Sequence, residues 1–185
     1  MTQSKLKGRK VALLATDGFE QSELMEPKRL LEEAGAQVTV IAPDGKQEIT
    51  GWHKKDWGRK IAVDQSLDQA KAESFDALVL PGGVMNPDNL RQLPKAVDFV
   101  KAFGDAGKPI AAICHGPWTL INAGLVKGHT MTSWPSLRLD LENAGATWVD
   151  KEVVVDNGLV TSRTPDDLPA FNRKLVEEIK EGVHA

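Results

Sequence analysis

Short apolar runs alternate with segments of helical periodicity along the whole chain, and this alternation constrains the fold more than any other feature. The runs that suit buried strands are 11–15, 38–41, 77–80, 110–113 and 159–161. Segments of helical period lie at about 22–34, 66–72, 95–103, 136–143 and 166–180, and Pro117 opens one more helix. Parallel strands need long crossover connections, which helices supply. We therefore expect an α/β fold, a three-layer sandwich around a mainly parallel sheet, in one domain over residues 1–185.

Smaller segments add detail to this pattern. Residues 43–63 are rich in Gly, Lys and Trp, which predicts an irregular excursion with short strands. Residues 130–132 suit a short strand. Two apolar stretches around Asn157-Gly158 predict a hairpin over 153–161, since this dipeptide favours tight two-residue turns.

Composition and charge exclude several classes of function. The formal net charge of -3 gives no basic field for phosphate backbones, so we expect no direct docking to nucleic acid. No apolar run reaches the roughly 18 residues that span a bilayer, and the first residues lack a signal-peptide pattern, so we expect a cytoplasmic protein without a membrane partner. One cysteine, four histidines without ligand spacing and no phosphate-binding glycine fingerprint predict neither a metal site nor an organic cofactor.

The single cysteine, Cys114, follows an apolar strand directly and precedes the helix at Pro117. A nucleophile on such a turn needs small residues two positions to either side, which Ala112 and Gly116 supply. The N-terminus of the following helix favours the thiolate, so we expect a thiol pKa below its usual value. The alternative is a buried structural cysteine that behaves as a small apolar residue.

Two other loops follow strands and should reach the same edge of the sheet, because ligands meet the carboxyl ends of parallel strands. The N–H groups of His115 and Gly83 are candidate oxyanion donors, although Pro81-Gly82-Gly83 also suits an ordinary tight turn. Glu20 follows the first strand, and a protonated carboxyl there would donate a hydrogen bond to the thiolate. The alternative for Glu20, as for the next acid Glu23, is a solvated helix face.

These loops together resemble a known family. Gly18-Phe19-Glu20, Leu80–Gly83, Cys114-His115-Gly116-Pro117 and Thr161–Leu168, in this order, are similar to the motifs of the ThiJ/PfpI superfamily. The resemblance is closest to the PfpI branch, the intracellular protease I group, with its bacterial general-stress and deglycase-type members. It covers nearly the whole chain.

The resemblance implies a flavodoxin-like, class I glutamine-amidotransferase-like fold in a homodimer or homohexamer. It implies that Cys114 is the nucleophile and that protonated Glu20 holds the thiolate. In this branch His115 pairs with an acid from a neighbouring subunit, and the matching position here is Asp88. Relatives often carry Glu there, so the shorter Asp88 is a departure that weakens a protease-like triad.

Three functions remain open at this stage. In the first, the Cys114 thiolate attacks a small aldehyde or a glycated substrate in a cleft lined by Gly82 and Trp118, while His115 or Glu20 moves protons. In the second, Cys114 and His115 hydrolyse a peptide, although an imidazole next in sequence is expected to point away from the sulfur. The third is a redox sensor or chaperone that uses Cys114 oxidation.

A glutaminase is not expected. Enzymes of that class carry a histidine late in the chain, and the corresponding stretch here reads Thr164-Pro165-Asp166.

Overall fold

A seven-stranded sheet forms the centre of the protein in the computed structural model, which describes residues 4–184. Its strand order is β11-β12-β8-β7-β1-β3-β6. The bounds are β1 (Lys10–Leu14), β3 (Gln37–Ala42), β6 (Gln65–Ser66), β7 (Ala77–Leu80), β8 (Ile110–Ile113), β11 (Val154–Asp156) and β12 (Leu159–Ser162). Every pairing is parallel except β11 with β12. The predicted mainly parallel α/β sheet is confirmed.

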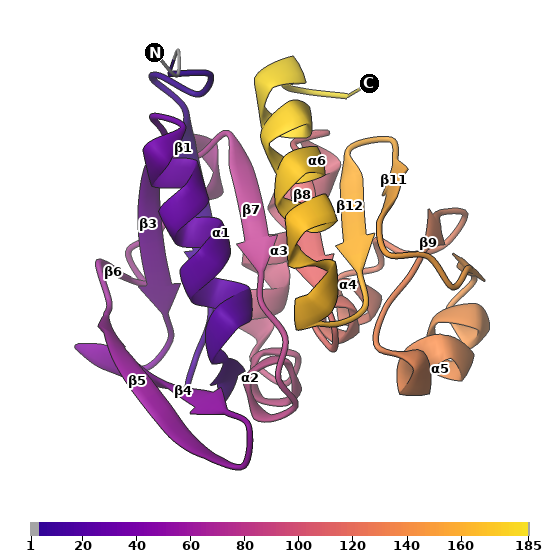
Figure 1. Ribbon diagram of the computed structural model, residues 1–185, viewed down its shortest axis with the longest axis horizontal. Helices are drawn as coiled ribbons and strands as arrows, with labels where there is room; N and C mark the ends of the chain where they lie inside the picture. Colours follow the sequence, from indigo (N-terminus) through magenta and orange to yellow (C-terminus); the bar gives the residue numbers. More distant parts are fainter. Residues whose placement is uncertain (1–3, 185) are drawn as a thin grey trace.

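Helices cover both faces of this sheet (Figure 1). They are α1 (Gln21–Glu33), α2 (Met85–Leu90), α3 (Pro94–Asp105), α4 (Pro117–Asn122), α5 (Arg138–Asn143) and α6 (Leu168–Glu181), with the 3-10 turns η1 (Ala72–Ser74), η2 (Pro135–Leu137) and η3 (Pro165–Asp167). Helices α1 and α6 lie side by side on one face, and α3 and α4 lie on the other. The three-layer sandwich expected from the alternating pattern is therefore present.

Strand β1 shows why the apolar runs carry no polar face. Val11 and Leu13 belong to the core beneath α1 and α6, whereas Ala12 and Leu14 belong to the core beneath α3 and α4. Successive side chains of a strand point to opposite faces, so a strand covered on both sides must be apolar at every position.

The smaller strands lie outside the main sheet. The segment predicted as an irregular excursion contains the hairpin of β4 (Glu48–His53) and β5 (Asp56–Ala62), which pairs with β2 (Phe19–Glu20). Strand β9 (Thr130–Met131) pairs with β10 (Thr147–Trp148). The predicted hairpin is confirmed, and its turn residues Asn157 and Gly158 both have positive φ, 48° and 83°.

Two local predictions need correction. The segment 66–72 is no helix: it starts in strand β6 and continues as a turn before η1. Helix α2 was not predicted, because it is only six residues long and contains Pro87.

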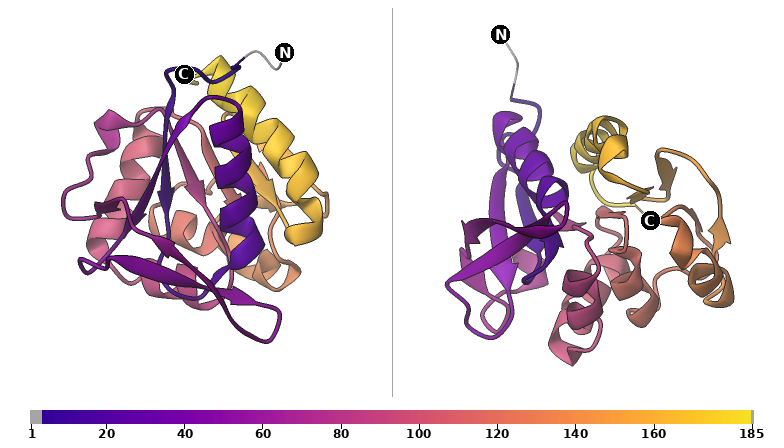
Figure 2. Two further views of the ribbon diagram at one scale, coloured as in Figure 1. Left: turned by 60° about the vertical axis from the view of Figure 1, so that its left-hand side comes forward. Right: turned by 60° about the horizontal axis from the view of Figure 1, so that its bottom comes forward.

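The carboxyl ends of β1, β7, β8 and β12 meet at one edge of the sheet, since these strands are parallel. Helix α2 and the β4–β5 hairpin lie at the same edge, which is the lower edge in Figure 1 and comes forward in the right-hand view of Figure 2. Loops from four separate strands therefore converge there. Among residues 4–184, no helix combines the length and apolar character needed to cross a membrane.

Candidate active site

Cys114 lies at the turn between β8 and α4 in a strained backbone conformation. Its φ is 63°, a left-handed value that is uncommon for a residue with a side chain. Its N–H donates to the Ser162 carbonyl at 3.0 Å, and its carbonyl accepts from the Trp134 N–H at 2.9 Å. A Cβ on Gly116 would stand 2.7 Å from the Leu80 carbonyl oxygen, which explains the small residue there. Neighbouring strands and loops therefore fix the turn.

The acid beside the thiol is Glu23, which corrects the expectation that Glu20 would be the partner. Glu23 lies on α1 with no exposed surface, and its Oε1 accepts the Gly82 N–H at 3.0 Å. A Cβ on Gly82 would lie 2.5 Å from this oxygen and 2.6 Å from the Cβ of Cys114. Only a glycine therefore lets the carboxyl and the cysteine approach each other here.

Among residues 4–184, no cationic group offsets the burial of the Glu23 carboxyl. Burial, reinforced by the negative charge of Glu20, raises the pKa of Glu23 to about 8. Hydrogen bonding with Gly82, Cys114 and Gly83 opposes this rise. Oε2 is buried and forms no hydrogen bond of good geometry within residues 4–184. At neutral pH the group is therefore a carboxylic acid and a proton donor.

Cys114 is buried, with 7% of the residue exposed. Burial raises its pKa, and ionised Glu23 raises it further, while the N–H groups of Gly83 and His115 lower it. The expectation of a lowered thiol pKa is wrong for this state, because burial, the largest cause, disfavours the charged sulfur. Gly83 and His115 are the two predicted oxyanion donors, and their role toward an oxyanion stays a prediction.

His115 faces the thiol. Its Nδ1 lies 3.2 Å from the Cys114 sulfur, so the expectation that an adjacent imidazole would point away is wrong. The left-handed φ of Cys114 is the cause, because it turns the next residue back toward the sulfur. The imidazole packs edge-on against Trp118, with 5.0 Å between the ring centres, and is stacked with Trp134, with 6.0 Å between the ring centres. Burial lowers the His115 pKa, so the ring is neutral at pH 7.

The other predicted residues lie around this centre. Glu20 is half-buried at the start of α1, where burial raises its pKa and His53 opposes the rise. Trp118 donates its indole N–H to Asp140 at 3.1 Å. Asp88 is exposed on α2, and within residues 4–184 no hydrogen bond or ion pair joins it to His115. Its proposed role from a neighbouring subunit stays a prediction.

Two residues of the site were not predicted from the sequence. The helical spacing could have indicated Glu23, because it lies on the same buried face of α1 as Leu24, Pro27 and Leu31. Asn86 is also fully buried, and its amide donates to the Pro81 and Gly82 carbonyls, both at 3.1 Å. Its Oδ1 accepts the N–H of Thr16, which follows β1, at 2.8 Å. Asn86 thus ties the loop after β7 to the loop after β1.

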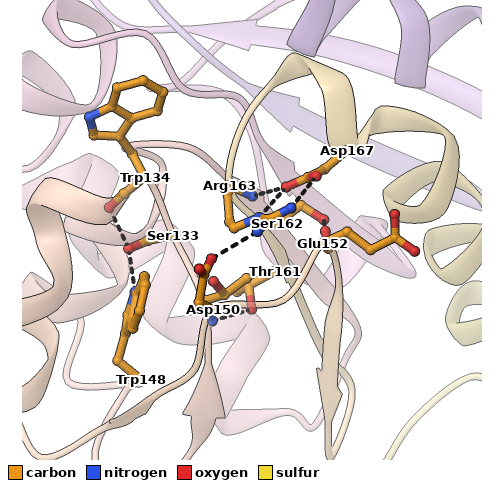
Figure 3. Close-up of polar contacts among 10 residues, drawn as sticks. Ser133, Trp134, Trp148, Asp150, Glu152, Thr161, Ser162, Arg163 and Asp167 are labelled. Carbon is orange, nitrogen blue, oxygen red and sulfur yellow. Dashed lines mark hydrogen bonds and ion pairs between the residues drawn. The ribbon is translucent and has the colours of Figure 1, made fainter.

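A second polar cluster supports the turn from the side of β12 (Figure 3). Arg163 donates from Nε and Nη2 to the two oxygens of Asp167, both at 2.9 Å, and from Nη1 to Asp150 at 2.8 Å. The Ser162 hydroxyl donates to the Glu152 carbonyl. The Ser162 carbonyl accepts the Cys114 N–H. The side chains of Ser162 and Arg163 therefore hold in place the segment that fixes the cysteine turn.

One group with metal-ligating atoms is found away from the thiol, at the end of α6. Atoms of Glu178, Glu181 and His184 lie within 4.8 Å of one another. His184 Nε2 and Glu178 Oε2 are 2.8 Å apart, an ion pair when the imidazole is protonated. The His184 N–H donates to Gly107, near the amino end of β8, so this group lies at the opposite edge of the sheet from Cys114.

Known proteins with this sequence pattern are numerous. The family model described as DJ-1/PfpI family matches residues 9–178. General stress protein 18 of Bacillus subtilis (strain 168) is 48% identical over 90% of this chain and 95% of its own length. YraA of the same organism, named as a proposed cysteine protease, is 46% identical over 93% and 99%. Protein/nucleic acid deglycase 2 of Escherichia coli (strain K12) is 44% identical over 91% and 96%.

Solved structures share the fold. A two-domain protein of Anabaena variabilis with DJ-1/ThiJ/PfpI-like and ferritin-like domains has a TM-score of 0.87 at 36% identity, over 92% of this chain and 48% of that one. DJ-1beta of Drosophila melanogaster has a TM-score of 0.83 at 30% identity, over 94% of both chains.

Proposed function

This chain belongs to the DJ-1/PfpI family, and we propose that it is a stress-protection enzyme acting on reactive carbonyl compounds through Cys114. The substrate class is methylglyoxal or its adducts on amines. The observation that carries the proposal is the buried Glu23 carboxyl, which keeps its proton beside the thiol. Relatives named as a general stress protein and a deglycase support it. A cytoplasmic location, where a lone thiol stays reduced, and a dimeric or hexameric assembly are parts of the same proposal.

In the first step the sulfur of Cys114 bonds to the aldehyde carbon. The thiol proton passes to Nδ1 of neutral His115, which is 3.2 Å from the sulfur. The aldehyde oxygen takes the proton of Glu23, and the N–H groups of Gly83 and His115, which lower the pKa of the thiol, are candidate donors to this oxygen. The product is a hemithioacetal. With an adduct on an amine, the carbon–nitrogen bond breaks as the carbon–sulfur bond forms, and the amine leaves with a proton.

In the second step Glu23, now ionised, removes the hydrogen from the carbon that carries sulfur. Glu23 returns this proton to the adjacent carbon, the former ketone, while the hydroxyl proton moves by way of His115 to the former ketone oxygen, so that one carbon is oxidised as its neighbour is reduced. This produces a thioester of lactic acid without any external redox partner. Water then cleaves the thioester, and lactate and the free thiol are released.

The test compares wild type with Cys114→Ser and Glu23→Gln for lactate formation from methylglyoxal and from a methylglyoxal-treated amino acid. We expect both variants to lose the activity, and melting temperatures near that of wild type would exclude misfolding as the reason. Lactate formation that persists in Cys114→Ser would overturn the proposal.

A peptidase is the second candidate, favoured by the 3.2 Å approach of His115 to the sulfur. The 7% exposure of Cys114 argues for a small substrate instead, because a polypeptide backbone needs an open cleft. Casein hydrolysis that depends on Cys114, together with inactivity on methylglyoxal, would reverse this order. A redox sensor has less support, since the raised pKa of the buried thiol slows oxidation.

A further inference from the structure

Three tryptophans surround the turn that carries Cys114. The rings of Trp118 and Trp134 contact His115 from two sides. Trp148 donates its indole N–H to Ser133 at 3.0 Å, and the Ser133 hydroxyl donates to the Trp134 carbonyl at 2.8 Å (Figure 3). Figure 3 also shows the Trp134 indole pointing away from Ser133 and Trp148. His115 therefore links Trp118 to Trp134, and Ser133 links Trp134 to Trp148.

Two of these indoles already carry an arginine. The guanidinium of Arg91 lies 5.3 Å from the centre of the Trp118 ring, and that of Arg138 lies 5.4 Å from the Trp148 ring. These are cation–π distances. Trp134 differs from both, since no lysine or arginine of residues 4–184 stacks on it, although it is 40% exposed.

The backbone of Trp134 is fixed independently of any ligand. Its N–H donates to the Cys114 carbonyl, and its carbonyl accepts from the buried Ser133. The ring is stacked with His115 at an interplanar angle of 22°, and this imidazole is neutral, so it brings no competing positive charge. With the backbone fixed and one ring face stacked, this indole needs little reorganisation to bind a cation.

We propose that the exposed indole of Trp134 binds the guanidinium of arginine, whose small adduct can reach the nearly buried Cys114. Guanidinium is planar and weakly hydrated, so it stacks on an indole better than a lysine ammonium does. The inference rests on the proposed function and deepens it: it assigns arginine adducts as the preferred substrate class and free arginine as the leaving group. The carbon–nitrogen bond that breaks is then the one to the guanidino nitrogen, which leaves with a proton.

The experiment measures binding without turnover, in the Cys114→Ser protein. The five indole N–H signals in its NMR spectrum are titrated with Nα-acetyl-argininamide, its neutral citrulline analogue and Nα-acetyl-lysinamide. We expect the arginine ligand to bind roughly two- to fivefold more tightly than either, with the largest shift at Trp134. Trp134→Leu should remove this preference, and Trp134→Phe should keep part of it. Trp57→Leu is the matched control, because Trp57 is also exposed but lies on the distant β5.

Equal binding of arginine and citrulline would overturn the inference, as would an arginine preference that survives in Trp134→Leu. An altered sedimentation of Trp134→Leu with an unchanged arginine preference would instead assign the indole to contact with a second copy. Because the ligands are not turned over, these outcomes are independent of whether Cys114 processes methylglyoxal. Failure of the proposed function and failure of the arginine site are therefore distinguishable.

Discussion

Two buried carboxyl groups lie at the same edge of the sheet and differ in their state of charge. Glu23 has no exposed surface, and Asp167 is 4% exposed. Burial alone would raise the pKa of both, since removal from water disfavours the charged form. At Glu23 no cationic group of the described residues offsets burial, and the pKa rises to about 8. At Asp167 the Arg163 guanidinium and backbone N–H donors outweigh burial, and the pKa is lowered.

This difference separates a carboxyl group that stabilises the structure, Asp167, from one that can take part in the reaction, Glu23. Ionised Asp167 holds Arg163, and the adjacent Ser162 carbonyl accepts the N–H of Cys114. Neutral Glu23 lies against the cysteine itself and retains a proton to donate. One carboxyl therefore holds the strained turn in place, and the other is available to the reaction at its sulfur.

The largest effect is expected on activity, when the Glu23 carboxyl is replaced. Glu23→Gln keeps the size and polarity of the side chain but cannot exchange the proton, so lactate formation from methylglyoxal should fall by about 100-fold or more. The measurement is kcat/KM for purified protein. Glu20→Gln, directly before the first turn of α1, is the matched control, and its loss should stay below about tenfold. A larger loss in Glu20→Gln than in Glu23→Gln would restore the assignment made from the sequence.

The protonated state of Glu23 also predicts how stability depends on pH. In the folded protein this carboxyl keeps its proton up to about pH 8, whereas in the unfolded chain it loses it near 4.5. Raising the pH between these values therefore favours unfolding, by on the order of 5 kcal/mol. Urea denaturation of Cys114→Ser with and without Glu23→Gln isolates this contribution, because no thiol titrates. Parallel stability curves from pH 5 to 9 would contradict a protonated Glu23.

Most of the fold could be predicted from the sequence. The apolar run 11–15 is long enough for a strand and apolar at every position, and Asn157-Gly158 specifies a tight hairpin turn. Helix α2 could not be predicted in this way, because a six-residue helix with an internal proline has no periodicity to detect. What stabilises it is tertiary: Asn86 on α2 bonds to the loops after β1 and β7.

The site was predicted only in part, because its chemistry depends on distances between segments. The turn around Cys114 follows from local spacing, and it is present. The choice between Glu20 and Glu23 depends on which way α1 is rotated against β7, which no local pattern reports. The orientation of His115 likewise depends on the left-handed φ of Cys114. Burial of the thiol, which reverses the expected direction of its pKa shift, is a property of the assembled core.

Replacing Asp167 should lower the stability of the fold more than the activity. Asp167→Asn leaves the Arg163 guanidinium without a charged partner on its less exposed side, and we expect a loss of about 2 kcal/mol in the free energy of unfolding. Because the folded pKa lies below 3.8, this contribution is present above that pH and is lost as the pH falls through the folded value. Denaturation at pH 7 and pH 3 measures both. A difference from wild type that stays constant down to pH 3 would argue against an ionised Asp167.

The smallest effect is expected at the other partner of Arg163. Asp150 accepts from Nη1 at 2.8 Å, a distance as short as those to Asp167, but its side chain is 67% exposed. Water and salt screen an exposed pair, so Asp150→Asn should change the free energy of unfolding by less than about 0.5 kcal/mol, and less still at high salt. Paired denaturation curves for Asp150→Asn and Asp167→Asn, at low and high salt, measure the contrast. Equal losses in the two variants would mean that distance to the guanidinium, and not burial, decides what a carboxylate contributes at this edge of the sheet.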